Sequence, residues 1–239
     1  MTPRRLDNSD AHPPVILVED LSLAREKGVF ARLPDFKLAP GQSLAIVGKS
    51  GSGKTTALMA LAAIREPASG RIEVGGIDPW TLPRAARDQF RCYFIGLVFQ
   101  SFHLIDALSV AANVLLPARF ASGLVDSRIA ARRGDRPSDE RERLAVLLDK
   151  LGLSDIASRR ADRISHGQAQ RVAVARALFN RPTAILADEP TSALDDANAS
   201  ALVELLKSSA VSENAALVIA THDRRVLNAV DRVIEVQSP

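Results

Sequence analysis

Cysteine and long apolar runs are nearly absent from this sequence of 239 residues. The single cysteine, Cys92, excludes a disulfide within the chain and a zinc site built from cysteines. No apolar run approaches the roughly 18 residues that a membrane-spanning helix needs. Arg4 and Arg5 are followed by the polar run Asp7 to Asp10, where a secretory signal would carry its apolar stretch. We therefore expect residues 1–14 to form a flexible tail on a cytoplasmic protein.

Aromatic residues are also scarce, at 4% of the chain, and the formal net charge is only +3. Proteins that bind single-stranded nucleic acid place basic residues among aromatic rings on which the bases stack. The basic residues here have no such pattern, so we expect no nucleic-acid partner. The densest charged run, Arg128 to Arg143, mixes both signs and contains Gly134 and Pro137, which indicates a solvated loop between two helices.

Apolar runs of strand length recur along the chain, and several are separated by helical patterns. This alternation predicts an α/β domain with a mostly parallel sheet. Two shorter runs, Phe36 to Leu38 and Ile72 to Val74, predict a small antiparallel layer. The longer runs are Val15 to Val18, Ser43 to Val47, Phe94 to Val98, Ala184 to Ala187 and Ala216 to Ala220.

The strand pattern fades between about Ser101 and Ile164. Within that stretch, apolar residues recur at helical spacing from Arg141 to Leu151, which predicts an amphipathic helix. We interpret residues 101–164 as a helical subdomain inserted into an α/β domain that covers residues 15–239.

A glycine-rich segment lies between an apolar strand-like run and a helix-like run. Gly48, Gly51 and Gly53 allow backbone N–H groups to surround an anion where side chains would block its approach. The order of strand, loop and helix argues against a chance glycine-rich turn. The predicted nucleotide-binding residues are Gly48, Lys49, Ser50, Gly51, Ser52, Gly53, Lys54, Thr55 and Thr56.

The last residues of this segment, Lys54 to Thr56, offer a positive charge to the phosphates and a hydroxyl to a metal ion. Lys54 carries a positive charge suited to the β- and γ-phosphates, and the N-terminus of the following helix also favours anions. Thr55 offers a hydroxyl to Mg²⁺, and Thr56 offers a contact to the α-phosphate. The segment therefore predicts that the chain binds ATP or GTP together with Mg²⁺.

Two carboxylates, Asp188 and Glu189, end the apolar run that begins at Ala184. In a parallel sheet this strand end lies beside the phosphate loop. Asp188 can then hold Mg²⁺, and Glu189 can accept the proton of a water that attacks the γ-phosphate. In isolation such a pair is more often two exposed acids after a strand. Here the pair follows a phosphate loop and continues into Pro190 to Asp195, which favours the catalytic interpretation.

A second anion site is indicated at Ser165, where a short polar turn leads into a helical pattern. A helix N-terminus with a serine hydroxyl and unpaired backbone N–H groups attracts anions. One nucleotide cannot readily use both anion sites if they lie apart on the surface. The pattern therefore suggests a second chain.

Taken in order, these motifs resemble the ATP-binding-cassette (ABC) ATPases, whose signature Leu-Ser-Gly-Gly-Gln is matched by Ile164 to Gln168. The resemblance covers nearly the whole chain after the tail. In that family two cassettes face head to tail, and each ATP lies between the phosphate loop of one and the signature of the other. The resemblance thus implies a homodimer in which Ser165, Gly167 and Gln168 contact the nucleotide of the second chain.

Three further residues take their roles from this resemblance. Gln100 matches the loop glutamine that senses Mg²⁺ and the membrane partner, and Asp195 ends the loop that crosses the dimer. His222 matches the switch histidine at the γ-phosphate. A lone histidine after a strand is ordinarily a surface residue, but the ordered set of motifs outweighs that interpretation.

Two positions depart from the family pattern. His166 replaces the first signature glycine, but Gly167 keeps the position of close backbone contact, so we expect function to survive. The aromatic residue that usually stacks on adenine is missing, since the only tyrosine, Tyr93, lies elsewhere in the sequence. Either the ring of Phe30 or the guanidinium of Arg25 can cover the base.

The segments Ile95 to Ile105 and Asn113 to Pro117 resemble the lipoprotein-release and macrolide-export branch. This resemblance implies an ATPase that drives a transmembrane permease from the cytoplasmic face of the membrane through ATP-driven dimer closure. A regulatory cassette of the cell-division type, which moves no cargo, is the alternative. A chromosome-maintenance cassette is disfavoured because coiled-coil heptads do not separate the phosphate loop from the signature.

Overall fold

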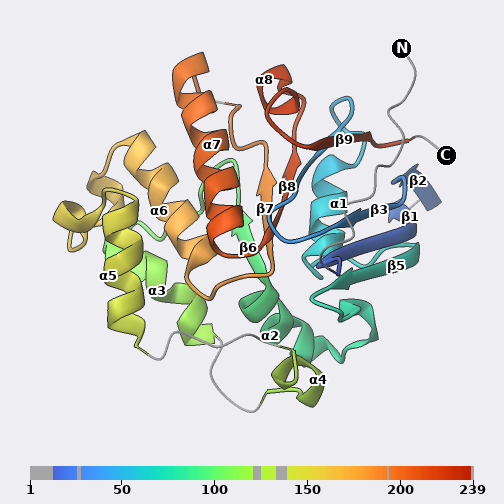
Figure 1. The fold of residues 1–239 in the computed structure, drawn as a ribbon, viewed down its shortest axis with the longest axis horizontal. Helices are drawn as coiled ribbons and strands as arrows, with labels where there is room; N and C mark the ends of the chain where they lie inside the picture. Colours follow the sequence, from blue (N-terminus) through green and yellow to red (C-terminus); the bar gives the residue numbers. More distant parts are fainter. Residues whose placement is uncertain (1–12, 26–27, 121–124, 133–138, 193, 238–239) are drawn as a thin grey trace.

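The computed structural model describes residues 13–25, 28–120, 125–132, 139–192 and 194–237. Figure 1 shows a central parallel sheet, with antiparallel strands on one side and helices α3, α5 and α6 on the other. Most of the predicted tail, residues 1–12, lies outside the described residues. Within the part of the chain that is described, every helix is too short or too polar to cross a lipid bilayer.

The parallel sheet has five strands in the order β6-β7-β8-β4-β9, and all neighbours run parallel. Its inner strands are nearly continuous apolar runs because both faces are covered by other elements. Alternate residues point to opposite faces, so Leu186 and Val218 pack in one core cluster and Ile185 and Leu217 in the other. The strands are β4 (Ser43–Val47), β6 (Ile95–Val98), β7 (Ala184–Asp188), β8 (Ala216–Ala220) and β9 (Arg232–Glu235).

The second sheet is antiparallel and is organised around its long first strand, which pairs with the other three. Its inward side chains form one core cluster with the helix after the phosphate loop and with one face of the parallel sheet. The predicted mixed α/β fold, with a parallel sheet and a small antiparallel layer, is confirmed. The strands are β1 (Ile16–Arg25), β2 (Gly28–Arg32), β3 (Phe36–Leu38) and β5 (Ser69–Val74).

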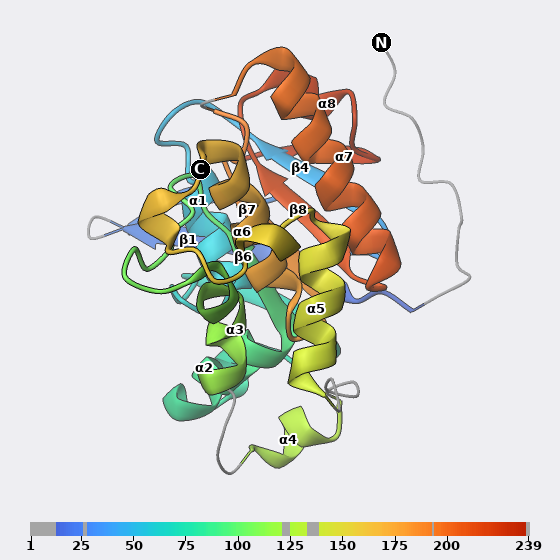
Figure 2. The same ribbon diagram turned by 90° about the vertical axis from the view of Figure 1, so that its left-hand side faces the viewer.

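Helices cover both faces of the parallel sheet. Seen from the side in Figure 2, α3, α5 and α6 lie next to one another at the front of the molecule. The α-helices are α1 (Lys54–Leu61), α2 (Arg84–Phe94), α3 (Val110–Phe120), α4 (Ser127–Ala130), α5 (Glu140–Lys150), α6 (His166–Leu178), α7 (Asp196–Ser212) and α8 (Arg224–Leu227). Short 3₁₀ turns are η1 (Pro79–Thr81), η2 (Ser154–Ile156) and η3 (Ala161–Arg163). The division at residues 101 and 164 stays a prediction.

Two local predictions need correction. The strand expected from Phe94 begins one residue later, because Phe94 ends α2 and its ring stacks on Phe90 at 5.2 Å. The charged run to Arg143 is not solvated throughout. Arg143 lies in α5 and is buried, where its guanidinium forms an ion pair with Glu213 at 2.9 Å and donates to the carbonyl of Leu178 at 2.8 Å. Residues 133–138 of that run lie outside the described residues.

Candidate nucleotide-binding site

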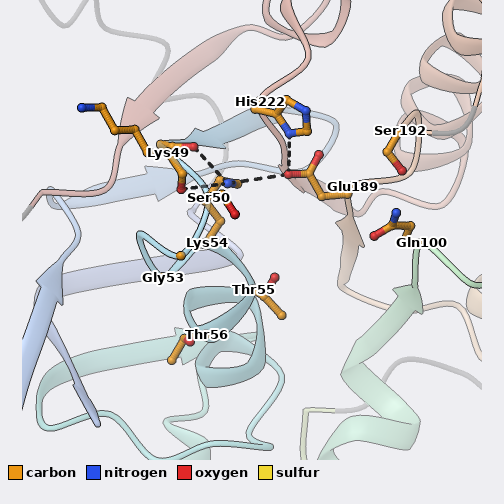
Figure 3. Close-up of a pocket in the computed structure, with 12 residues that line it drawn as sticks. Lys49, Ser50, Gly53, Lys54, Thr55, Thr56, Gln100, Glu189, Ser192 and His222 are labelled. Carbon is orange, nitrogen blue, oxygen red and sulfur yellow. Dashed lines mark hydrogen bonds and ion pairs between the residues drawn. The ribbon is translucent and has the colours of Figure 1, made fainter. Parts of the chain in front are cut away.

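A cavity of about 650 Å³ opens at the carboxyl ends of four parallel strands. Loops after β4, β6, β7 and β8 each contribute residues to it, which is where open parallel sheets bind ligands. Its volume lies within the usual range for small-molecule sites, about 300–1,000 Å³. Figure 3 shows the lining residues as sticks, most of them labelled. The lining residues are Gly48, Lys49, Ser50, Gly51, Gly53, Lys54, Thr55, Thr56, Gln100, Glu189, Ser192 and His222.

The phosphate loop has the backbone shape that the glycines were expected to allow. Gly51 and Gly53 have φ angles of 78° and 114°, which other residues rarely adopt. A side chain on Gly53 would also lie 3.0 Å from the ring of Phe30. Phe30 therefore packs directly against the loop, and Gly53 is required both for its conformation and for this contact. The side chain of Arg25 lies outside the described part of the chain.

Lys54 points into the loop instead of into solvent. Its ammonium group donates to the carbonyls of Gly48 at 2.9 Å and Lys49 at 3.3 Å, and it lies 3.6 Å from a carboxylate oxygen of Glu189. These contacts are drawn in Figure 3. A buried cation surrounded by oxygen atoms is placed where an anionic group can replace those oxygens.

Thr55 and Asp188 form a pair suited to a hard cation. The Thr55 hydroxyl donates to the Asp188 carboxylate at 3.1 Å. Burial raises the pKa of Asp188, an effect that the hydrogen bond from Thr55 opposes. A divalent cation would favour the ionised carboxylate. A hydroxyl beside a carboxylate at the edge of a phosphate cavity is therefore a donor set that fits Mg²⁺.

Glu189 is held in an uncommon backbone conformation. Its φ angle is 45°, a left-handed value that costs a residue other than glycine about 1–3 kcal/mol. The backbone N–H donates to the carbonyl of Ala220 at 2.8 Å, and the Thr221 hydroxyl donates to the carboxylate at 3.1 Å. His222 Nδ1 lies 2.9 Å from the other carboxylate oxygen. The carboxylate thus faces the cavity between Lys54 and His222, as Figure 3 shows.

The predicted signature residues are not in this cavity. Ser165 caps α6 through a reciprocal pair of bonds with Gln168, at 3.2 Å and 2.9 Å. Gly167 is exposed, and a Cβ atom placed on it would meet nothing within 4 Å. The ring of His166 lies against Phe102, in the segment that follows Gln100. The N-terminus of α6 therefore presents an open surface of its own.

The structure brings together the phosphate loop, Gln100, Glu189 and His222, and it pairs Asp188 with Thr55. It also places Ser192 in the cavity, a residue that sequence reasoning did not select. The loop containing Ser192 was recognisable from its position after Glu189. No local signal indicates which of its side chains faces the cavity.

A profile of the ABC transporter family matches residues 32–192, which is more than half of the chain. The chain belongs to the ABC transporter family. The predicted fold and ATPase activity are therefore confirmed, and the chain binds and hydrolyses ATP as the ATP-binding subunit of a transporter.

Relatives of both kinds expected in this branch, for lipoprotein release and for macrolide export, match the chain. The lipoprotein-releasing system ATP-binding protein LolD 1 of Rhodopirellula baltica is 40% identical over 201 residues, which cover 84% of this chain and 82% of the relative. The macrolide export ATP-binding/permease protein MacB 2 of Aeromonas hydrophila is 36% identical over 200 residues, which cover 84% of this chain and 29% of that longer relative. The predicted branch is thus confirmed.

A solved structure extends the comparison to three dimensions. The ATP-binding cassette MJ0796, solved as a dimer in a post-hydrolysis state bound to ADP and Pi, superposes with a TM-score of 0.72 at 30% identity. The superposition covers 93% of this chain and 94% of MJ0796. The chain therefore has the architecture of an ABC ATPase.

Proposed function

We propose that two copies of this chain close on two ATP molecules and that hydrolysis reopens them, which drives a membrane permease of the lipoprotein-release or macrolide-export type. The observation that carries this proposal is the separation of two incomplete sites. The cavity holds the phosphate loop and Glu189, while Ser165 and Gly167 lie exposed outside it. The cavity lacks the exposed helix N-terminus at Ser165 and Gly167, and that helix N-terminus lacks a phosphate loop. The related cassette MJ0796 is dimeric in its ADP- and Pi-bound state.

Within one chain, the loop from Gly48 to Thr56 holds the phosphates of ATP, and Lys54 exchanges its carbonyl partners for phosphate oxygens. Thr55, Asp188 and Gln100 hold Mg²⁺, which when bound neutralises charge on the β- and γ-phosphates. The hydrogen bond between Thr55 and Asp188 supports this assignment, because it places a hydroxyl and a carboxylate side by side next to the phosphate loop.

Glu189 acts as the general base. Its carboxylate takes a proton from water as the water oxygen bonds to the γ-phosphorus and the bond to the β–γ bridging oxygen breaks, so ADP leaves with that electron pair. His222 orients the carboxylate and contacts the γ-phosphate. Support comes from the 2.9 Å separation of His222 Nδ1 and the Glu189 carboxylate.

Across the dimer, the N-terminus of α6 contacts the nucleotide held by the other chain. Ser165 supplies a hydroxyl, Gly167 allows close backbone approach, and Gln168 keeps the cap in shape. Asp195 ends the loop that crosses the interface. We propose a pair of identical chains, because this chain carries both halves of the site.

The permease docks beside Gln100. A second cavity of about 300 Å³ lies between β6, α2, α3 and α6, with Phe99, Pro117 and Arg176 in its wall. This position connects a bound permease segment to Gln100 through Phe99. Binding of the permease at this cavity would hold the chain at the cytoplasmic face of the membrane. The regulatory alternative uses the same surface, and cargo movement by a reconstituted complex distinguishes the two.

The deciding experiment compares ATP hydrolysis and molecular mass under Mg-ATP for the wild type, Glu189→Gln and Lys54→Ala. We expect turnover by the wild type, a stable ATP-bound dimer with turnover lowered at least about a hundredfold for Glu189→Gln, and no nucleotide binding for Lys54→Ala. Rapid turnover by Glu189→Gln would remove Glu189 from its role. Tight ATP binding by Lys54→Ala would contradict the phosphate assignment.

A further inference from the structure

Arg225, in α8, connects two loops that carry the proposed catalytic pair. Its guanidinium donates to both oxygens of Asp223, at 2.6 Å from Nη2 and 2.9 Å from Nε. Nη1 donates to the carbonyl of Leu194 at 3.2 Å and to Asp196 at 2.7 Å, and Nη2 donates to the carbonyl of Thr191 at 3.4 Å. All five N–H groups of the guanidinium are thus engaged.

The same two loops are joined by a second set of bonds. The Thr191 hydroxyl donates to the Asp223 carboxylate at 2.6 Å, and the backbone N–H of Asp223 donates to the Thr221 hydroxyl at 3.0 Å. Thr221 in turn donates to Glu189. The loop after β7, which carries Glu189, is therefore fixed to the loop after β8, which carries His222.

We propose that Arg225 is a positioning residue that holds these two loops as one unit, so that Glu189 and His222 stay face to face. The loop from Thr191 to Asp195 then moves together with His222. The inference rests on the proposed roles of Glu189 and His222. Arg225 itself is not among the described residues that line the nucleotide cavity, so its effect on the reaction is indirect.

The chemistry of the contact requires arginine. A planar fork reaches a carboxylate and two carbonyls at once, whereas the ammonium of lysine has three donors on a single nitrogen. Asp223 is the main anionic partner because its side chain is only 12% exposed. Asp196 is 94% exposed, so its ion pair with Arg225 is screened by solvent and contributes little.

The test compares Arg225→Lys and Arg225→Ala with two controls, Arg224→Ala and Asp196→Asn, in the full chain. Arg224 is the exposed neighbour of Arg225 in α8. We expect kcat to fall at least about tenfold in both Arg225 variants, with KM for ATP changed less than about threefold. The controls should change kcat less than about twofold. Equal losses in kcat and ATP affinity, or an unchanged kcat in Arg225→Ala, would overturn the proposal.

Amide hydrogen exchange of the nucleotide-free chain provides a readout that does not depend on hydrolysis. In Arg225→Lys the segment from Thr191 to Asp196 and the segment from His222 to Arg225 should both exchange faster, while β7 and β8 stay protected. Faster exchange confined to α8 would overturn the proposal. If the wild type fails to hydrolyse ATP while both segments loosen together in Arg225→Lys, the proposed catalytic roles fail, and only the joining of the two loops by Arg225 stands.

Discussion

The imidazole of His166 lies against the ring of Phe102, with the ring centres 4.9 Å apart and the planes tilted by 57°. This contact joins the residue that replaces the first signature glycine to the segment after Gln100. Arg176, from the same helix as His166, donates to the carbonyls of Phe102 and His103 and fixes that segment. Gly167 keeps an open surface. At the start of α6, the ring of His166 therefore contacts Phe102, while the backbone at Gly167 stays open.

His166→Gly should leave ATP hydrolysis within about threefold of the wild type, because Gly167 and not His166 presents the open backbone. Loss of the ring contact should lower the melting temperature by a few degrees, as expected for a ring pair worth about 0.5–1.5 kcal/mol. Steady-state kinetics and thermal unfolding test this, with Phe102→Leu as the matched variant. A rise in kcat by orders of magnitude would instead identify His166 as an obstacle at the nucleotide.

Phe30→Ala should weaken binding of ATP by about tenfold if its ring covers the base, since stacking on an aromatic ring is worth about 1–3 kcal/mol per base. Phe30 also packs on Gly53, so the loop itself is a second target of the substitution. Calorimetry with ATP and with tripolyphosphate separates the two effects. A lower affinity for ATP alone indicates that Phe30 stacks on the base. An equal loss of affinity for both ligands indicates a distorted loop and would favour Arg25 as the residue that covers the base.

Glu213→Ala should destabilise the fold by about 3–5 kcal/mol, because it leaves the guanidinium of Arg143 buried without its anion. The two side chains are only 10% and 9% exposed. Chemical denaturation measures the difference. The double variant Arg143→Met with Glu213→Leu is the control and should recover most of the loss. A decrease below about 1 kcal/mol in the single variant would show that water solvates this pair.

Asp223→Asn should be less stable than the wild type, with a difference that depends on pH only below about pH 5. Hydrogen bonds from Arg225 hold the pKa of Asp223 well below its ordinary value. A carboxylate with a lowered pKa stabilises the fold above its unfolded pKa, about 3.9, and that stabilisation is lost as pH falls through the lower folded value. Thermal unfolding from pH 8 to pH 3 should show a constant difference above about pH 5. A difference that vanishes between pH 7 and pH 5 would contradict this.

Local motifs and buried strands were predictable because their signals lie in neighbouring residues. The glycines and Lys54 of the phosphate loop occupy one short segment. All of β8, and β7 up to Asp188, are apolar because both sheet faces are covered. The strand β2 was not predicted. It pairs along its length with the preceding strand and forms one further bridge, between Arg32 and Gln237, and its residues alternate little between exposed and buried positions.

The amino-acid sequence by itself determined the class of fold, the phosphate loop, the strand-end carboxylates and the family, since each depends on residue types at short fixed spacing. Only the tertiary structure decided which distant side chains meet. Arg143 forms an ion pair with Glu213, and the ring of His166 contacts Phe102. Arg225, which follows β8, donates a hydrogen bond to the loop that follows β7. The physical reason is that sheet order brings the ends of β7 and β8 together, and no short-range pattern encodes the orientation of side chains across that boundary.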